Sequence, residues 1–130
     1  MSQKGFIVMV GFQVERGEPM QHAADATVVI VAYRPKPGKD KDLLQLTREH
    51  VALLREEGLA TERPVVAARA GDGTIVEVFE WAPGGVERAH SNPSVRKLWE
   101  RYAVACEIVP LNQVAESSTT FASFVPLYLD

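Results

Sequence analysis

The stretch GTIVEVFEW, from Gly73 to Trp81, decides the fold of this chain. Its β-branched and aromatic residues are typical of a β-strand, whose side chains alternate between two faces. Alternation places Ile75, Glu77, Phe79 and Trp81 on one face of the strand, and Val76, Val78 and Glu80 on the other. Each face combines apolar side chains with one carboxylate. We therefore expect a strand that is covered on both sides, with separate roles for Glu77 and Glu80.

The segments around this strand predict further strands and helices. The turn Gly71-Asp72-Gly73 predicts a hairpin with the preceding segment, which Pro64 interrupts. A continuous β-branched run is typical of a strand buried on both faces, and apolar residues at helical spacing predict helices. In chain order the expected elements are a strand at 27–33, a helix at 42–57, a strand at 60–70 and the strand at 73–81. A short helix at 86–90, a longer helix at 93–109 and a strand at 119–127 follow.

The resulting order of elements is strand, helix, strand, strand, helix, strand. This order is the split β-α-β plan, so we expect an α+β, ferredoxin-like antiparallel sheet in a domain that covers residues 27–130. Helices on one face of such a sheet leave the other face uncovered. Because apolar residues would remain on that uncovered face, we expect two copies of the chain to pair through it as a homodimer.

The N-terminal residues 1–26 precede this domain. Alternation of apolar residues in GFIVMVGFQV (5–14) predicts a strand or an arm, followed by a linker. The run is too short to span a bilayer, which needs about 20 apolar residues, and no small-residue cleavage site follows it. We therefore expect neither a signal peptide nor a membrane partner.

Composition excludes several classes of function. The chain has 130 residues, the length of one domain, and its net charge of −3 without a basic stripe argues against a nucleic-acid partner. Cys106 is the only cysteine, so internal disulfides and thiolate metal clusters are excluded, and we expect a cytoplasmic protein. The histidines lack metal-ligand spacing and no glycine-rich phosphate loop occurs, so we expect neither a metal nor a nucleotide cofactor.

Residues 27–127 resemble the antibiotic biosynthesis monooxygenase superfamily of dimeric α/β barrels. The resemblance covers about four-fifths of the chain. It rests on TVVIVAYRPKPGKD (27–40), a helix that ends in EEGL (56–59), the strand EVFEW (77–81) and RAHSNPSV (88–95). It implies a pocket between the sheet and the helices of each subunit.

The resemblance also implies an activity. Well-studied enzymes of this family oxidise phenolic or quinol-like molecules with molecular oxygen and use no metal or flavin, because the substrate anion itself reduces oxygen. The protein binds the aromatic compound, takes or stabilises a proton, and excludes water. By this resemblance the chain is expected to be a cofactor-independent monooxygenase that acts on a small aromatic, phenolic or quinol-type compound.

Two histidines are the candidate catalytic residues. His90 is the first candidate for proton transfer, because the family that the chain resembles commonly has a histidine at this point; the alternative is a helix-end residue with a capping bond. His50 lies near the centre of the apolar stripe of the helix at 42–57. It either lines a pocket or is a core histidine that is hydrogen-bonded to a carbonyl or a glutamate.

Five further residues are candidates for substrate binding: Tyr102, Trp81, Trp99, Glu77 and Glu80. The hydroxyl of Tyr102 would reach a pocket, and the tryptophans would line its walls, although packing alone explains large aromatic side chains. One glutamate is expected to fix the tautomer of a pocket histidine, and the other to lie at a rim or a dimer interface. Alternation does not say which is which. Cys106 is expected to be inert.

Two other functions use similar residues. Haem-degrading enzymes of the same superfamily resemble one another in an asparagine, a tryptophan and a histidine. In this chain residues 28–34 contain no asparagine, His90 stands in the place of the tryptophan, and Glu100 stands in the place of the histidine. Haem degradation is therefore set aside, although His90 by itself would still be able to ligate iron. A non-catalytic dimer that binds a small hydrophobic metabolite needs the same aromatic walls and remains the alternative.

Overall fold

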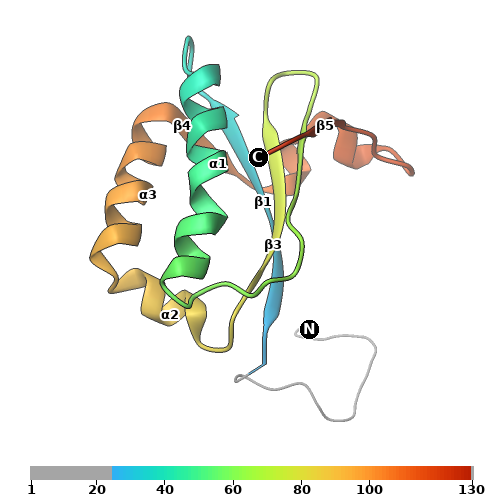
Figure 1. The fold of residues 1–130 in the computed structure, drawn as a ribbon. Coiled ribbons are helices and arrows are strands. Elements are labelled where there is room, and N and C mark those ends of the chain that lie inside the picture. Colours follow the sequence, from blue (N-terminus) through green and yellow to red (C-terminus); the bar gives the residue numbers. More distant parts are fainter. Residues whose placement is uncertain (1–24, 130) are drawn as a thin grey trace.

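Strand β3 (Ile75–Trp81), which contains both glutamates, lies at the centre of an antiparallel sheet. The computed structural model describes residues 25–129, which form five strands in the order β4-β1-β3-β2-β5 (Figure 1). The other strands are β1 (Thr27–Pro35), β2 (Val66–Arg69), β4 (Cys106–Val109) and β5 (Val125–Leu127). The β2–β3 hairpin is confirmed, because Ala70 N–H donates to the Thr74 carbonyl oxygen over 2.8 Å.

Two long helices lie together on one side of this sheet (Figure 1). They are α1 (Asp40–Glu56) and α3 (Pro93–Ala105), and the short helix α2 (Gly85–His90) connects β3 to α3. A bidentate ion pair joins the long helices: Arg101 on α3 donates to both carboxylate oxygens of Glu49 on α1, over 2.7 and 3.1 Å. Together with strands β1 to β4, the helices form an α+β arrangement that is compatible with a ferredoxin-like fold.

Helix boundaries follow the local signals that the sequence contains. Gly58, just beyond the end of α1, adopts a left-handed conformation (φ 73°) that glycine enters without steric cost. Asn92 caps α3, since its side chain accepts a hydrogen bond from Val95 N–H over 3.1 Å. Pro93 occupies the first turn, where its missing N–H is not needed.

The prediction that the last helix continues to Val109 is wrong. Helix α3 ends at Ala105, and residues 106–109 form β4, which pairs with β1 so that Cys106 lies opposite Pro35 and Val109 opposite Ala32. The spacing of Tyr102, Cys106 and Val109 fits a helix and also fits a change into a strand. The available edge of β1, far away in the sequence, selects the strand.

The final strand is therefore not the one that was predicted. β4 is the fourth strand of the split plan, whereas β5 covers only Val125–Leu127 of the expected 119–127 and pairs with β2 at the opposite edge of the sheet. Pro64 interrupts the segment before β2 as expected: Ala60 forms an isolated bridge with Trp81, and β2 itself begins at Val66.

The sheet has two unlike faces. The face toward α1 and α3 carries the main hydrophobic core, which includes Leu43, Leu54 and Phe79. On the opposite face, Val114 covers Ala32 and Val76, because the segment after β4 crosses there through two short 3-10 helices, Leu111–Gln113 and Ala115–Ser118 (Figure 1).

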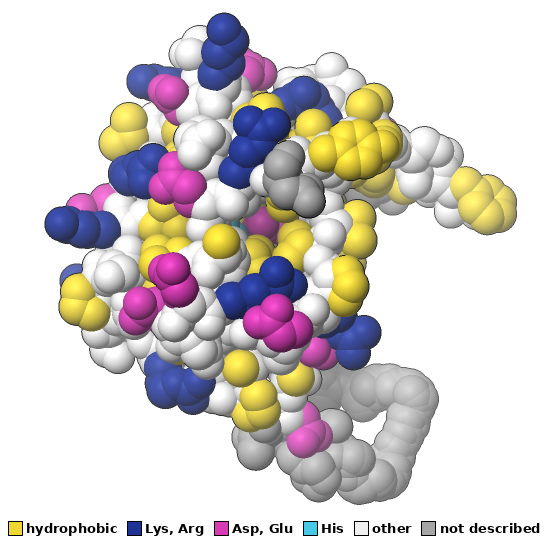
Figure 2. All heavy atoms as spheres, viewed as in Figure 1, with side chains coloured by type: hydrophobic (Ala, Val, Ile, Leu, Met, Phe, Trp, Pro, Cys, Tyr) yellow, Lys and Arg dark blue, Asp and Glu magenta, His cyan; other side chains and the backbone are white. Residues whose placement is uncertain are grey.

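The remainder of that opposite face is open. Val28, Ile30 and Val66 lie on it with 50, 51 and 58% of their surface exposed. The prediction that the 27–33 strand is buried on both faces is therefore wrong for a single copy of the chain. Figure 2 shows charged side chains spread over the helix side and hydrophobic side chains on the protruding C-terminal segment, which contains the exposed Phe121.

The predicted strand or arm within residues 1–26 lies almost wholly outside the described residues. None of the helices formed by residues 25–129 has the length and apolar character that crossing a bilayer requires.

Candidate functional site

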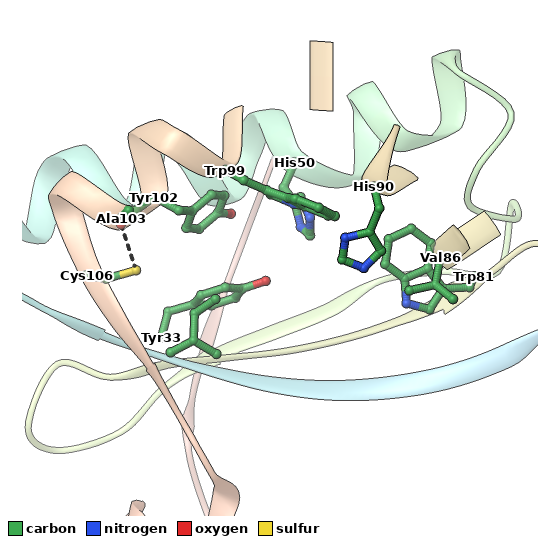
Figure 3. Close-up of a pocket in the computed structure, with 10 residues that line it drawn as sticks. Tyr33, His50, Trp81, Val86, His90, Trp99, Tyr102, Ala103 and Cys106 are labelled. Carbon is green, nitrogen blue, oxygen red and sulfur yellow. Dashed lines mark hydrogen bonds between the residues drawn. The ribbon is translucent and has the colours of Figure 1, made fainter. Parts of the chain in front are cut away.

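A cavity of about 620 Å³ lies between helices α2 and α3 and the sheet (Figure 3). Its volume is in the range of sites for small organic ligands, about 300–1,000 Å³. All the main elements except β2 and β5 contribute to its walls. The lining residues are Tyr33, His50, Trp81, Val86, His90, Trp99, Tyr102, Ala103, Cys106 and Ile108.

Glu77 organises the inner wall of this cavity. Its side chain is fully buried on the helix-facing side of β3. Oε1 accepts a hydrogen bond from the hydroxyl of Tyr33 over 2.9 Å and lies 3.0 Å from Nδ1 of His50. A carboxylate only accepts hydrogen bonds, so Nδ1 of His50 is the donor in this contact, and in the neutral tautomer that fits it the lone pair is on Nε2.

The fold brings these three residues together from three elements. Val31 lies opposite Glu77 in the β1–β3 ladder, which places Tyr33, two residues along β1, as the diagonal neighbour of Glu77 on the same face. His50 comes from the buried stripe of α1, between Thr47 and Leu54. Only the tertiary structure makes the cluster, since its members are 44 and 27 residues apart from Glu77 in sequence.

Tyr102 presents a buried donor without a partner. Its side chain is 3% exposed and stacks on Tyr33 with ring centroids 4.9 Å apart. Among the described residues, its hydroxyl and the second oxygen of Glu77, Oε2, have no hydrogen-bond partner. A buried polar atom without a partner is costly, and the side chain of Thr47 interacts with this hydroxyl, which partly offsets the rise in the pKa of Tyr102.

Both tyrosines stay protonated over the physiological range. Burial raises the pKa of Tyr33 and of Tyr102 well above the ordinary value of a phenol, and the negative charge of Glu77 raises both further. They are therefore hydrogen-bond donors. In Figure 3 the two hydroxyl groups point the same way, toward the part of the cavity where His50 and His90 lie.

His90 lies at the solvent side of the cavity. Its side chain is exposed, and its ring packs edge-on against Trp99 with centroids 5.2 Å apart. Trp81 packs in the same way on Phe79 at 5.1 Å, and Figure 3 shows Trp81 and Val86 close to His90 at one end of the cavity. The two histidines thus differ: His50 is buried and held by a carboxylate, whereas His90 has one ring contact.

Glu80 lies on the opposite face of β3 from Glu77. The hydroxyl of Thr61 donates to it over 2.8 Å, and Arg63 lies 3.1 Å away; the hydrogen bond from Thr61, and then Arg63, lower the pKa of Glu80 below its usual value. Neither glutamate lines the cavity, but Glu77 contacts two residues that do, Tyr33 and His50, whereas Glu80 faces away from it.

Sequence reasoning missed Tyr33, whose hydroxyl shares Glu77 with His50. The alternation of β1 places Tyr33 on the same face as Val29 and Val31, but only the pairing register shows that this face carries Glu77. Val86, Ala103 and Ile108 also line the cavity without having been candidates. Within residues 25–129, no group of three histidine, cysteine, aspartate or glutamate side chains is arranged to hold a metal ion.

The buried carboxylate generates a prediction on stability. Glu77→Leu is expected to lower the free energy of unfolding by about 3–5 kcal/mol, because it leaves buried donors on His50 and Tyr33 without an acceptor. Glu77→Gln keeps an acceptor oxygen and should cost less. Urea denaturation at pH 7 measures both. Glu80→Leu on the same strand is the control, and an equal loss there would contradict the assignment.

Cys106 generates a second prediction. Burial raises the pKa of its thiol to about 11, so its thiolate fraction at pH 8 is roughly two-hundredfold below that of an ordinary cysteine with a pKa of about 8.5. Alkylation by iodoacetamide at pH 8 should therefore be at least about a hundredfold slower in the folded protein than in the chain unfolded in urea. Equal rates would show that the thiol is freely accessible and not perturbed.

Comparison of the chain with protein-family models, with curated proteins and with solved structures finds no match. The family that the sequence resembles therefore stays a prediction.

Proposed function

We propose that this protein is a dimeric α/β barrel of the antibiotic biosynthesis monooxygenase type, and that it oxidises a small phenolic or quinol-type compound with molecular oxygen and no cofactor. One observation carries the proposal: a histidine base, held by a buried glutamate, lies at the inner wall of an apolar cavity with aromatic sides. The resemblance in sequence supplies the reaction type, and this geometry supplies residues that suit it.

The walls suit a flat aromatic ligand. Trp81, Trp99 and Tyr33 provide aromatic surfaces on different sides of the cavity, while Val86 and Ile108 add aliphatic contacts. Aromatic rings bury large areas and stack on ligands of their own kind. Such walls also exclude water from the cavity. Molecular oxygen is apolar and therefore enters the cavity readily.

Proton removal is the step that the protein performs. With Nδ1–H donated to Glu77, Nε2 of His50 takes the proton of a phenol or of an acidic ring carbon, and the imidazolium that forms lies 3.0 Å from the carboxylate. Tyr102 donates a hydrogen bond to the oxygen on which negative charge develops. This ranks His50 before His90 as the base, because His90 is exposed and no carboxylate orients it.

The oxidation is balanced with oxygen as the only oxidant. The ring anion transfers electrons to oxygen and one oxygen atom bonds to the ring carbon. In the keto form of the substrate this ring carbon is a methylene, and it becomes a carbonyl as its two hydrogens leave with the second oxygen atom as water. His90, at the solvent side next to Trp99, is placed to contact the outer part of the ligand.

The uncovered part of the sheet supports a homodimer. Val28, Ile30 and Val66 form an apolar surface on the face that the helices do not cover, and Glu80 borders it with its partner Arg63. A second copy that presents the same surface across a twofold axis would bury these side chains. Glu80 would then lie beside the interface.

A non-catalytic protein that binds a hydrophobic metabolite is the alternative, because the same walls serve binding alone. Turnover separates the two functions. A ligand that co-purifies, together with the absence of oxygen uptake for every compound tested, would favour binding.

Oxygen consumption tests the proposed activity. The purified protein, treated to remove metal, is expected to consume oxygen above the autoxidation blank with members of a panel of anthrones and hydroquinones. His50→Gln should lower this rate by about 10²–10⁴, because it removes the general base. His90→Gln should have the smaller effect and act mainly on KM. A His50→Gln rate equal to wild type would contradict the assignment of the base.

Sedimentation velocity tests the dimer. Ile30→Lys places a charge in the uncovered apolar surface and is expected to convert a dimer into a monomer, since an unpaired charge is costly in an interface. Val104→Lys, at a 63% exposed position on α3, is the matched control and should leave the dimer intact. A wild-type monomer, or an Ile30→Lys dimer, would overturn the proposed pairing.

A further inference from the structure

We infer that residues 5–14 of the chain dock along the open side of the cavity and complete its separation from solvent. The cavity is the one that the proposed function uses, but the inference depends on the walls of the cavity and on no reaction. Three observations carry it: apolar walls that solvent reaches, the place where the chain enters the described fold, and an apolar stripe of matching length in the sequence.

The cavity has apolar walls that solvent still reaches. Val86 and Ile108 line it with 38 and 66% of their surface exposed, and the side chain of His90 beside Trp99 is exposed as well. Covering apolar surface of this kind is favourable by about 25 cal/mol per Å². No lysine or arginine lines the cavity, so an uncharged apolar segment suits it.

The described chain begins at the outer end of this cavity. Thr27, the first residue of β1, lies opposite Trp81 in the β1–β3 ladder, so the two side chains share a face. Figure 1 shows this start of β1 at the same end of the molecule as helix α2, which carries Val86 and His90. The part of the chain that precedes residue 25 therefore enters the fold beside the exposed walls.

The cavity extends along β1, which gives it a definite length. One end is at Trp81, opposite Thr27, and the other is at Ile108, opposite Tyr33. In a strand, the chain from Thr27 to Tyr33 spans about 20 Å, at about 3.3 Å per residue. A segment that covers the whole open side must therefore be at least about seven residues long when extended.

Residues 5–14, which lie outside the described residues, have this length and a suitable pattern. In GFIVMVGFQV every second residue from Phe6 is apolar, which gives a stripe of Phe6, Val8, Val10, Phe12 and Val14. In an extended chain these side chains lie on one side over about 26 Å. Residues 15–24 connect the stripe to the fold and can span up to about 35 Å, so the stripe can turn back along the full length of the cavity.

A competing place for this segment is the uncovered sheet surface of Val28, Ile30 and Val66. It lies on the other face of the sheet from the cavity, and the proposed pairing of two copies covers it. That pairing leaves the walls of the cavity exposed. The cavity is therefore the surface to which we assign residues 5–14.

Quenching of tryptophan fluorescence by acrylamide tests whether the segment covers the cavity. The chain contains two tryptophans, Trp81 and Trp99, and both line the cavity, so the fluorescence reports on this site. Phe6→Ser combined with Phe12→Ser interrupts the stripe in the otherwise unchanged chain. The quenching constant should then rise about two- to threefold, because both indoles lose a covering surface.

The matched control is Ile7→Ser combined with Met9→Ser, in the other set of the alternation. It removes two large apolar side chains from the same segment and should leave the quenching constant unchanged. An unchanged constant in the stripe variant, or an equal rise in the control, would overturn the inference.

Photo-cross-linking identifies the surface that the segment contacts. With p-benzoylphenylalanine at position 12, mass spectrometry is expected to find cross-links within one chain to residues 81–90 or 99–108. Cross-links to residues 28–30 or 66 would place the segment on the opposite face of the sheet, and cross-links between two chains would assign it to a partner copy. Either result would overturn the inference.

Both measurements are made without substrate and without oxygen uptake. A failure of this inference therefore leaves the proposed oxidation standing. Equally, the absence of oxygen uptake removes the oxidation and leaves the docking of residues 5–14 to be decided by the quenching and the cross-links.

Discussion

The hydrogen bonds of one buried carboxylate hold the candidate site together. Glu77 lies at the centre of the sheet, entirely out of water, and its Oε1 receives Tyr33 from β1 and His50 from α1. Removing a carboxylate from water has a large cost, which hydrogen bonds from buried donors offset. The cluster thus ties two strands and a helix to one geometry.

The same carboxylate sets the chemistry of its neighbours. It fixes the tautomer of His50, so that the free nitrogen is Nε2, and its negative charge adds to burial in keeping both buried tyrosines protonated. A base and a hydroxyl donor then coexist in one apolar cavity without neutralising each other. This is the property on which the proposed oxidation depends.

The opposite face of the sheet has a different role. There the segment after β4 covers Ala32 and Val76, while Val28 and Ile30 stay half exposed. Glu80 lies beside them with Thr61 and Arg63 and has no connection to the cavity. The two glutamates of one strand therefore serve different surfaces, because an odd spacing in a strand sends side chains to opposite faces.

Local patterns in the sequence predicted the elements that depend on near neighbours. Gly58 and Asn92 mark helix ends through their own backbone and side-chain geometry, and the hairpin before β3 follows from its glycine turn. The apolar stripe of α1 indicated that His50 points inward. The change from α3 to β4 at Cys106 was not predictable, since it depends on the distant edge of β1.

The sequence by itself determined the α+β class, the alternation that separates Glu77 from Glu80, and the inward position of His50, because each follows from the period of a single strand or helix. Only the tertiary structure decided that Glu77, and not Glu80, contacts the cavity residues His50 and Tyr33. It also placed His90 in solvent. Those facts depend on the register and packing of segments far apart in the chain, which no local pattern encodes.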